Sequence, residues 1–347
     1  MQPKLTPAAR RRLRDADDRD SLDEAFAVYR DAGVLSASVP AEYGGTAAGD
    51  LTRLYVELAA ENLTACFVLT QQNGAVGRLV AGTSEAARTQ WLPDIAAGRA
   101  NATVGISHLS TSRQHVRQPP VTVRLEGDAI TVSGFVPWST AADRAAVIVT
   151  GGVSEAGEVL LAIPRSTDGV RPADPMQLLA LSASNTGVIT LSDVRVGRNA
   201  LLAGPSESVM RSGSPGGTGS LTTSSLAVGL SQRAVTLLEE EARGRDEVRA
   251  SYEPLRDEFE HLKADLLHAA SPGDSEGKQS SEALRTRANS LALRSSQALM
   301  TASKGAGFVR GHPAERAVRE AMFFLVWSCP KPVAEAAMSE FACRLAG

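Results

Sequence analysis

The pattern of hydrophobic and polar positions divides the chain into three parts, and residues 1–100 have the spacing of helices. Ser21 and Ser84 stand where N-cap residues are expected, each just before a helical pattern. The predicted helices cover residues 22–31, 50–60, 65–80 and 85–96. The first part is therefore expected to be a helical domain.

From about residue 101 the helical spacing gives way to alternation of apolar and polar residues. Residues 121–125 and 129–132 alternate on either side of Glu126-Gly127-Asp128, which predicts a β-hairpin. Further strands are predicted over residues 146–150, 159–163, 187–191 and 194–196. Several short strands without a helical pattern between them predict an antiparallel sheet or a small barrel.

The last part of the chain returns to helical spacing. Leu226, Leu230, Ala234 and Leu238 fall on one face of a long helix. Four more helices are predicted over residues 255–269, 282–304, 314–327 and 332–345, with mobile loops over 204–219 and 271–281. The fold class is thus α+β, with domains over residues 1–100, 101–203 and 204–347.

Length, charge and cysteine content narrow the possible functions. A chain of 347 residues exceeds one ordinary core, and its formal charge of -3 is spread without basic clusters. Nucleic acid is therefore not expected as a partner. Cys66, Cys329 and Cys343 have no CxxC spacing, so we expect neither a disulfide framework nor a metal site. No apolar run reaches the length of a membrane span, and the cytoplasm is the expected location.

Several short motifs occur along the chain in the same order as the motifs of a known protein family. Val39 to Gly45 is similar to V-P-E-x-Y-G-G, and Gly134 to Thr140 is similar to G-x-K-x-W-I-T. Residues 184–196 are similar to S-x-T…D-V-x-V-P. In the last part, 304–308 and 316–320 are similar to G-G-x-G-Y and R-x-x-R-D. Together these segments resemble the acyl-CoA dehydrogenase superfamily of flavoproteins over nearly the whole chain.

The resemblance implies a fold, a cofactor and an assembly. The fold would be an N-terminal helical domain, a central antiparallel β-barrel or sheet domain, and a C-terminal four-helix-type bundle. The cofactor would be FAD, and the substrate a small molecule, possibly an acyl-CoA. Relatives of this kind form homodimers or homotetramers, so a homo-oligomer is expected.

Four residues of the central part would contact the flavin ring if the resemblance holds. Trp138 would pack on the ring and Thr140 would hydrogen-bond it, with Ser139 beside them. Ser107 matches a family Thr or Ser that meets the ring. The alternative is that Trp138 is a residue of the barrel rim and that the hydroxyls cap a turn.

Three residues of the last part would bind the other end of the cofactor. Arg245 falls where the family places an arginine that reaches the diphosphate in a neighbouring subunit, and a guanidinium can bond two phosphate oxygens at once. Gly305 and Gly307 would let the backbone approach the adenine closely. Alternatively, Arg245 is a solvated charge and the glycines form a left-handed helix C-cap.

The catalytic residue cannot be assigned from the sequence. Dehydrogenation needs a base for the substrate proton, and Ser328 occupies the position at which most relatives have a Glu. His108 is a candidate acid or base, whereas His115 is favoured as a loop residue. Cys329 is favoured as a buried structural thiol rather than a nucleophile.

Three functional hypotheses follow from these residues. The first is an FAD-dependent oxidoreductase, similar to an acyl-CoA dehydrogenase that acts on CH–CH groups, whose substrate is an acyl thioester or a related small molecule. The second is a flavin-dependent monooxygenase of the same fold. The third is a catalytically inactive family member.

Overall fold

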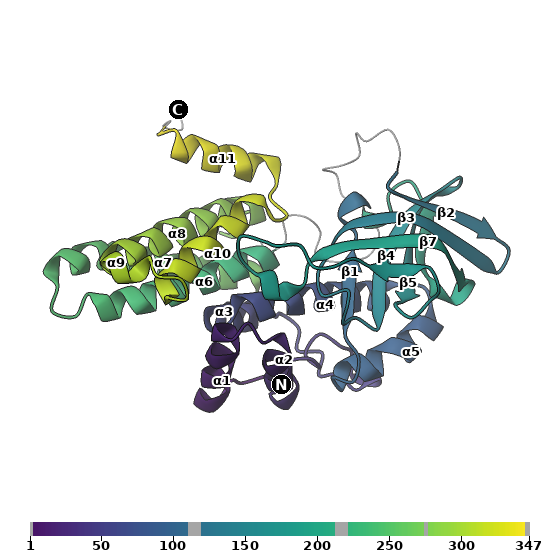
Figure 1. Cartoon of the computed structure of the whole chain (residues 1–347), viewed down its shortest axis with the longest axis horizontal. Helices are drawn as coiled ribbons and strands as arrows, with labels where there is room; N and C mark the ends of the chain where they lie inside the picture. Colours follow the sequence, from purple (N-terminus) through teal and green to yellow (C-terminus); the bar gives the residue numbers. More distant parts are fainter. Residues whose placement is uncertain (1–2, 110–118, 212–220, 274–276, 344–347) are drawn as a thin grey trace.

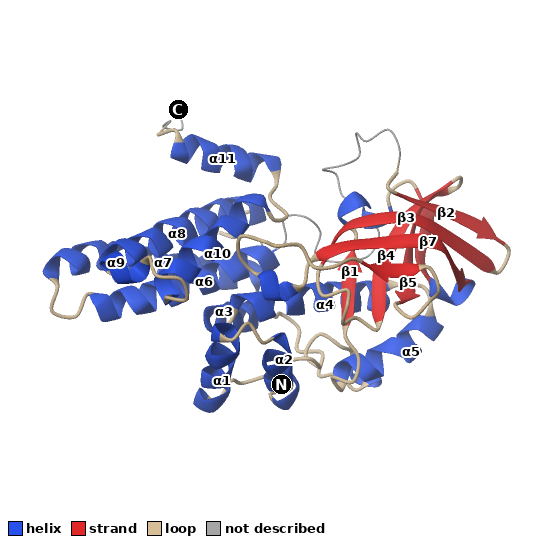
Figure 2. Cartoon of the chain, in the orientation of Figure 1, coloured by secondary structure: helices blue, strands red, loops and turns tan. Residues whose placement is uncertain are grey.

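The computed structural model describes residues 3–109, 119–211, 221–273 and 277–343. Figure 1 shows a sheet at one end, a bundle of long helices extending to the other end, and the N-terminal helices packed along one side of both. Figure 2 shows the same division by element type, with all strands gathered in one body. This order of helical, sheet and helical parts is the one predicted from the sequence.

The N-terminal part contains five helices, all but the first of which were predicted. The side chains of Thr6, Ser21, Asn62 and Ser84 each accept a hydrogen bond from the backbone N–H three residues further on and so cap four of these helices. The helices are α1 (Pro7–Asp18), α2 (Leu22–Asp31), α3 (Thr52–Glu61), α4 (Leu63–Ala81) and α5 (Glu85–Ala96).

Eight strands form one sheet with the order β6-β7-β3-β2-β4-β5-β8, and β1 pairs with β4 off this path. The predicted hairpin is present as β2 and β3, with Val123 opposite Val132. The sheet also has two parallel pairings, β1 with β4 and β2 with β4, so it is mixed rather than purely antiparallel. The strands are β1 (Ala102–Gly105), β2 (Val121–Glu126), β3 (Ala129–Ser139), β4 (Val147–Ser154), β5 (Gly157–Pro164), β6 (Val170–Pro172), β7 (Gly187–Gly197) and β8 (Leu201–Ser206).

The predicted loop over residues 204–219 is wrong for its first residues. Strand β8 continues to Ser206 and pairs with β5, and a 3₁₀ turn follows at Val209–Arg211. Gly204 has a φ of 87°, and a Cβ there would lie 2.3 Å from the carbonyl oxygen of Glu158. The glycine therefore permits close strand pairing instead of marking a loop. Residues 212–219 lie outside the described part of the chain.

The C-terminal part is a bundle in which α6, α7, α8 and α10 pack on one another. Helix α7 begins at Asp246 rather than at residue 255, because the chain accommodates Pro254 inside the helix. The short α11 contacts α8 and α10 and projects from the bundle in Figure 1. The helices are α6 (Leu221–Glu241), α7 (Asp246–Ala270), α8 (Ser281–Ala302), α9 (Lys304–Gly307), α10 (Pro313–Val326) and α11 (Lys331–Phe341).

Helix α4 lies at the centre of the molecule. One of its ends belongs to a core cluster shared with the N-terminal helices and the bundle, through residues such as Phe67. Its other end, with Val76 and Leu79, packs in a second cluster with sheet residues such as Val149 and Leu202. A third cluster fills the sheet itself. Among the described helices none has the length and hydrophobicity of a membrane span.

Candidate functional site

Trp138 owes its exposed position to an irregularity in β3. Val136 pairs with Ile189 and Ser139 pairs with Gly187, so two residues of β3 face one residue of β7. Such a bulge changes the direction in which side chains point. The Trp138 side chain is 37% exposed, whereas Ser139 is completely buried. An aromatic surface is thus presented to solvent at the end of the strand.

Three hydroxyl groups form a buried cluster next to Trp138. The Oγ1 atoms of Thr140 and Thr186 are 3.1 Å apart, and Ser184 Oγ lies 2.9 Å from Thr186 Oγ1. Three hydroxyl protons serve only these two bonds, so one proton is left over for a further acceptor. Thr103 Oγ1 donates to the Thr140 carbonyl at 2.6 Å and fixes the strand end to β1. The cluster can therefore donate one more hydrogen bond.

Ser139 lies between β3 and β1 rather than toward the solvent. Its Oγ is buried and has no hydrogen-bond partner among the described residues. A Cβ at Gly105 would lie 2.7 Å from this oxygen and 2.6 Å from Val136 Cγ1. Because Gly105 has no side chain, β1 can approach β3 this closely. The approach places the turn after β1 beside β3, the strand that carries Trp138.

That turn, the 3₁₀ segment Ser107–Leu109, carries two predicted site residues. Ser107 is partly exposed, and His108 is buried with a 7% exposed side chain. His108 Nε2 lies 2.8 Å from the Gly151 carbonyl oxygen, which can only accept, so Nε2 carries the proton. This bond anchors the turn to β4. His115, the other histidine considered, lies outside the described residues.

Arg245, Gly305 and Gly307 come together at the far end of the bundle. Arg245 Nη1 donates to Glu241 at 2.8 Å and to the Ala302 carbonyl at 3.0 Å, directly before the glycine segment. Both glycines lie within α9 without a positive φ, so the left-handed C-cap alternative is wrong. A Cβ on Gly305 would meet no atom within 4 Å, so the backbone at Gly305 is open to close approach.

The two groups of predicted cofactor residues are widely separated within one chain. Figure 1 places α9 at the tip of the bundle and β3 in the sheet at the opposite end of the molecule. A separation seen in projection can only be larger in space. Within one chain, α9 therefore lies apart from the sheet to which β3 belongs.

Ser328 lies in an exposed loop directly after α10. Its φ of 44° is left-handed, which costs energy for a residue other than glycine. The preceding Trp327 packs edge-on against Phe67 of α4 with ring centroids 4.7 Å apart, and it stacks on Phe323 at 5.5 Å. In the described part of the chain no ion pair or hydrogen bond joins this loop to an acidic side chain.

Arg285 of α8 lies beneath this loop in an environment that the sequence did not predict. The residue is 2% exposed, Nη2 donates to the Trp327 carbonyl at 3.0 Å, and the guanidinium carbon lies 5.9 Å from the Phe324 ring centre. Its Nε is buried without a hydrogen-bond partner among the described residues. Burial lowers the pKa of Arg285 to about 10, so the group stays charged at neutral pH.

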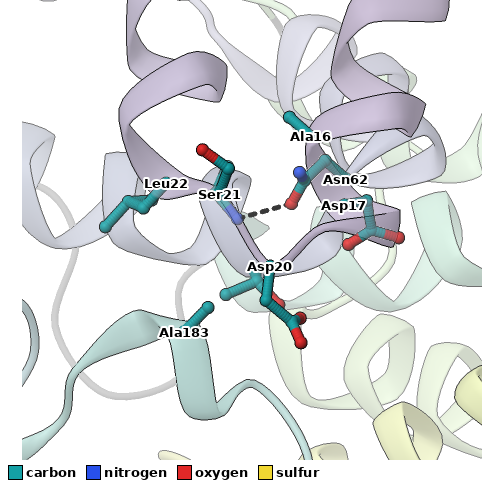
Figure 3. A pocket seen from close by; sticks show the side chains of 9 residues that line it. Ala16, Asp17, Asp20, Ser21, Leu22, Asn62 and Ala183 are labelled. Carbon is teal, nitrogen blue, oxygen red and sulfur yellow. Dashed lines mark hydrogen bonds between the residues drawn. The ribbon is translucent and has the colours of Figure 1, made fainter.

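A second group of buried charges lies where α1 meets the bundle. Asp17 is paired with Arg233 Nη1 at 2.7 Å and with Arg316 Nη1 at 3.0 Å. Glu320 is 2% exposed next to them, and burial, followed by repulsion from Asp17, raises its pKa to about 8. Figure 3 shows a small cavity lined by Asp17, Asp20, Ser21 and Asn62 among others, and none of the predicted cofactor residues lines it.

No group of three or more His, Cys, Asp or Glu side chains suited to a metal occurs in the described ranges. Cys66 is buried, and burial raises its pKa strongly. Cys329 is partly buried, and burial also raises its pKa, although Arg285 opposes the shift. Neither thiol is activated as a nucleophile would be.

Comparison with known proteins identifies the fold. Residues 1–99 match the family "Acyl-CoA dehydrogenase, N-terminal domain". The protein "Probable acyl-CoA dehydrogenase YngJ" of Bacillus subtilis (strain 168) is 24% identical in an alignment of length 322 that covers 86% of this chain and 84% of that protein. The resemblance found in the sequence is thereby confirmed.

Solved structures extend the likeness to the whole chain. The structure titled "FkbI for Biosynthesis of Methoxymalonyl Extender Unit of Fk520 Polyketide Immunosuppresant" is similar with a TM-score of 0.78 and 23% identity, over 99% of each chain. A glutaryl-CoA dehydrogenase from Mycobacterium smegmatis, solved in complex with FADH2, has a TM-score of 0.75 and 17% identity, over 98% of this chain and 95% of that one.

Proposed function

We propose that this chain, which has the acyl-CoA dehydrogenase fold and matches that family's N-terminal domain over its first 99 residues, is an FAD-dependent oxidoreductase. Its substrate would be an acyl thioester or a related small molecule. The observation that carries the proposal is the exposed Trp138 ring beside a buried hydroxyl cluster with a spare proton. A flavin needs an apolar surface and a few fixed polar groups, and these residues fit it.

Each predicted residue of the sheet would have a distinct role toward the flavin. A bound flavin would supply the redox chemistry by accepting a hydride equivalent. Trp138 would exclude water from one side of the ring. Thr140, through its cluster with Thr186 and Ser184, would donate a hydrogen bond to the flavin. Ser107, on the partly exposed turn after β1, would meet the ring.

Neither Ser328 nor His108 provides a ready base for the substrate proton. A serine hydroxyl such as that of Ser328 does not take up a proton at neutral pH without help. His108 stays a candidate from the sequence, although its Nε2 is already used as a donor to Gly151. The substrate's proton must therefore be taken up by a base other than a Glu at position 328, or the reaction is not the dehydrogenation of a thioester.

We propose that the binding site is shared between two copies of the chain. Trp138 and Thr140 lie at the end of β3, whereas Arg245, Gly305 and Gly307 lie where α7 begins and in α9. A homodimer or homotetramer could place the bundle tip of one copy beside the sheet of another. Arg245 would have to give up part of its bonding to Glu241 and Glu247 to reach a diphosphate.

Reconstitution with FAD tests the proposal directly. The purified protein is incubated with FAD, desalted, and examined for the absorbance of bound flavin. We expect binding, and we expect Trp138→Leu to weaken it at least about tenfold through the loss of aromatic contact. Trp91→Leu, a matched change on α5, should leave it unchanged. A colourless wild-type protein would remove the main support for the proposal.

Mixing two defective variants tests whether the site is shared between copies. Trp138→Leu damages the sheet side and Arg245→Ala damages the bundle side, so neither homo-oligomer should bind FAD well. Random mixed dimers would restore about one site in four, because one of the two sites in each mixed dimer is intact. If refolded mixtures regain no binding, each site is built from a single chain.

Ser328, in place of the family's usual Glu, favours a second candidate function. A monooxygenase that uses reduced flavin and oxygen would not need that carboxylate. It predicts oxygen consumption that depends on added reduced flavin and is lost in His108→Ala. A stable oligomer that binds no flavin would instead favour a catalytically inactive family member.

A further inference from the structure

The starting observation is that Arg285 is a buried cation without a buried acid. Among the described residues, no carboxylate lies within 4.0 Å of its guanidinium, and its polar contact is the Trp327 carbonyl. Removing a charge from water is costly unless an opposite charge or several hydrogen bonds compensate. The last carbonyls of α10 and the Phe324 ring supply only part of that compensation.

The cover over Arg285 is the loop that follows α10. The guanidinium bonds the carbonyl of Trp327, and the next residue, Ser328, is exposed with a strained left-handed backbone. Cys329 is only partly buried and lies close enough to interact electrostatically with Arg285. A loop with one strained residue, Ser328, therefore covers the partly compensated charge of Arg285.

This loop carries Ser328, which the resemblance places at the position of the family's catalytic Glu. Trp327 packs on Phe67 of α4, the helix that joins the bundle to the sheet. Asn289, one turn beyond Arg285 on α8, donates to the Phe324 carbonyl at 2.9 Å and holds the end of α10. The end of α10 is thus fixed from below, whereas in the described part of the chain a single hydrogen bond, from Arg285 to the Trp327 carbonyl, joins α8 to the loop after it.

We propose that Arg285 is the recognition residue for a carboxylate group on the substrate, received at the loop of Trp327, Ser328 and Cys329. The carboxylate would take over the guanidinium's unpaired Nε and supply the missing negative charge. This inference rests on the proposed function, because it names the class of substrate for the same site. The substrate is then a small acid, or an acyl compound whose far end carries a carboxylate.

Propionate, with uncharged propionamide as its match, is the probe for this site. Melting temperature is followed during titration at constant ionic strength with sodium chloride. Ligands that bind only the folded state raise the melting temperature in a saturable way. We expect such a rise with propionate, at a dissociation constant on the order of 1 mM, and none with propionamide.

Three variants decide whether Arg285 causes the effect. Arg285→Met should weaken the response to propionate at least about tenfold, whereas Arg287→Met, on the same helix but paired with Asp265, should keep it. Ser328→Glu should abolish the response, because the introduced carboxylate occupies the guanidinium itself. Ser328→Glu keeps the test valid if Arg285→Met fails to fold.

The outcomes separate this inference from the proposed function. A wild-type protein that binds FAD but shows no saturable response to propionate overturns only the carboxylate site. A response that persists in both Arg285→Met and Ser328→Glu also overturns it. A protein that responds to propionate as expected but never binds FAD overturns only the flavin proposal.

Discussion

The two ends of helix α10 bury arginines in opposite ways. Toward its beginning, Arg316 shares Asp17 with Arg233 of α6, and Glu320 lies beside them. At its end, Arg285 meets a carbonyl and an aromatic ring but no acid among the described residues. In the first group the arginine charges are compensated by acids of the same chain, and the group joins α1 to the bundle. In the second the charge of Arg285 is compensated only in part, so an anionic ligand could supply the rest.

The largest expected effect comes from breaking the balanced group. Asp17→Asn removes the charge shared by Arg233 and Arg316 and leaves two buried cations, so the free energy of unfolding should fall by about 3–5 kcal/mol. Chemical denaturation measures the change. Asp31→Asn, at an exposed pair with Arg12, should cost less than about 1 kcal/mol. Equal losses in both variants would show that burial does not distinguish the two pairs.

The pH dependence of stability should come from the same group. Glu320 has a folded-state pKa of about 8, above its ordinary value of 4.5, so between these values the folded chain holds one proton more than the unfolded chain. Stability from this residue is complete below the lower value and falls by roughly 1 kcal/mol per pH unit as pH rises toward 8. Above pH 8 the loss levels off, because both states are then ionised.

Glu320→Gln tests this assignment. The variant cannot ionise, so its denaturation curves from pH 5 to pH 9 should lack the decline seen in the wild-type protein. Asp17, Arg233, Arg316 and Arg319 all act on Glu320 and remain in place in the variant. An unchanged decline in Glu320→Gln would place the titrating group elsewhere.

The partly balanced arginine should behave differently on removal. Arg285→Met replaces a poorly compensated charge with an apolar side chain of similar length, so the free energy of unfolding should change by less than about 1 kcal/mol. Denaturation in the absence of carboxylates measures it. A loss as large as that of Asp17→Asn would mean that Arg285 is fully compensated in the folded chain, and the contrast would disappear.

The smallest effect is expected at Ser328. Glycine adopts a φ of 44° without strain, so Ser328→Gly should gain up to about 1 kcal/mol, reduced by the greater freedom of the unfolded chain. Thermal denaturation measures the gain. A clear loss would show that the Ser328 side chain makes a stabilising contact that outweighs the backbone strain.

Local signals in the sequence predicted most elements. Ser21 and Ser84 marked helix starts correctly, and the Glu126-Gly127-Asp128 turn marked the hairpin. Helix α1 was missed because its sequence, PAARRRLRDADD, is dominated by charged residues and has few apolar ones to mark a buried face. It is held by contacts from distant residues, including the pair between Asp17 and Arg233, which no local pattern contains.

The candidate site was predictable only in its residue types. Trp138 was identified as a flavin-contacting candidate, but its exposure depends on a bulge set by pairing with β7, fifty residues later in the chain. The environment of Arg285 could not be predicted, because whether a buried charge is balanced depends on which helices meet around it. Arg245 was expected to reach outward, yet its bonds to Glu241 and Ala302 follow from the way α7 meets the end of α8.

The position of helix α4 affects how the molecule unfolds. It contacts the sheet through β1 and β4, the bundle through α6, and the N-terminal helices through α2 and α3. None of the three parts can lose its structure without exposing a face of this helix. Amide hydrogens in the middle of α4 should therefore exchange with deuterium only through global unfolding, and the three parts should melt in one cooperative transition.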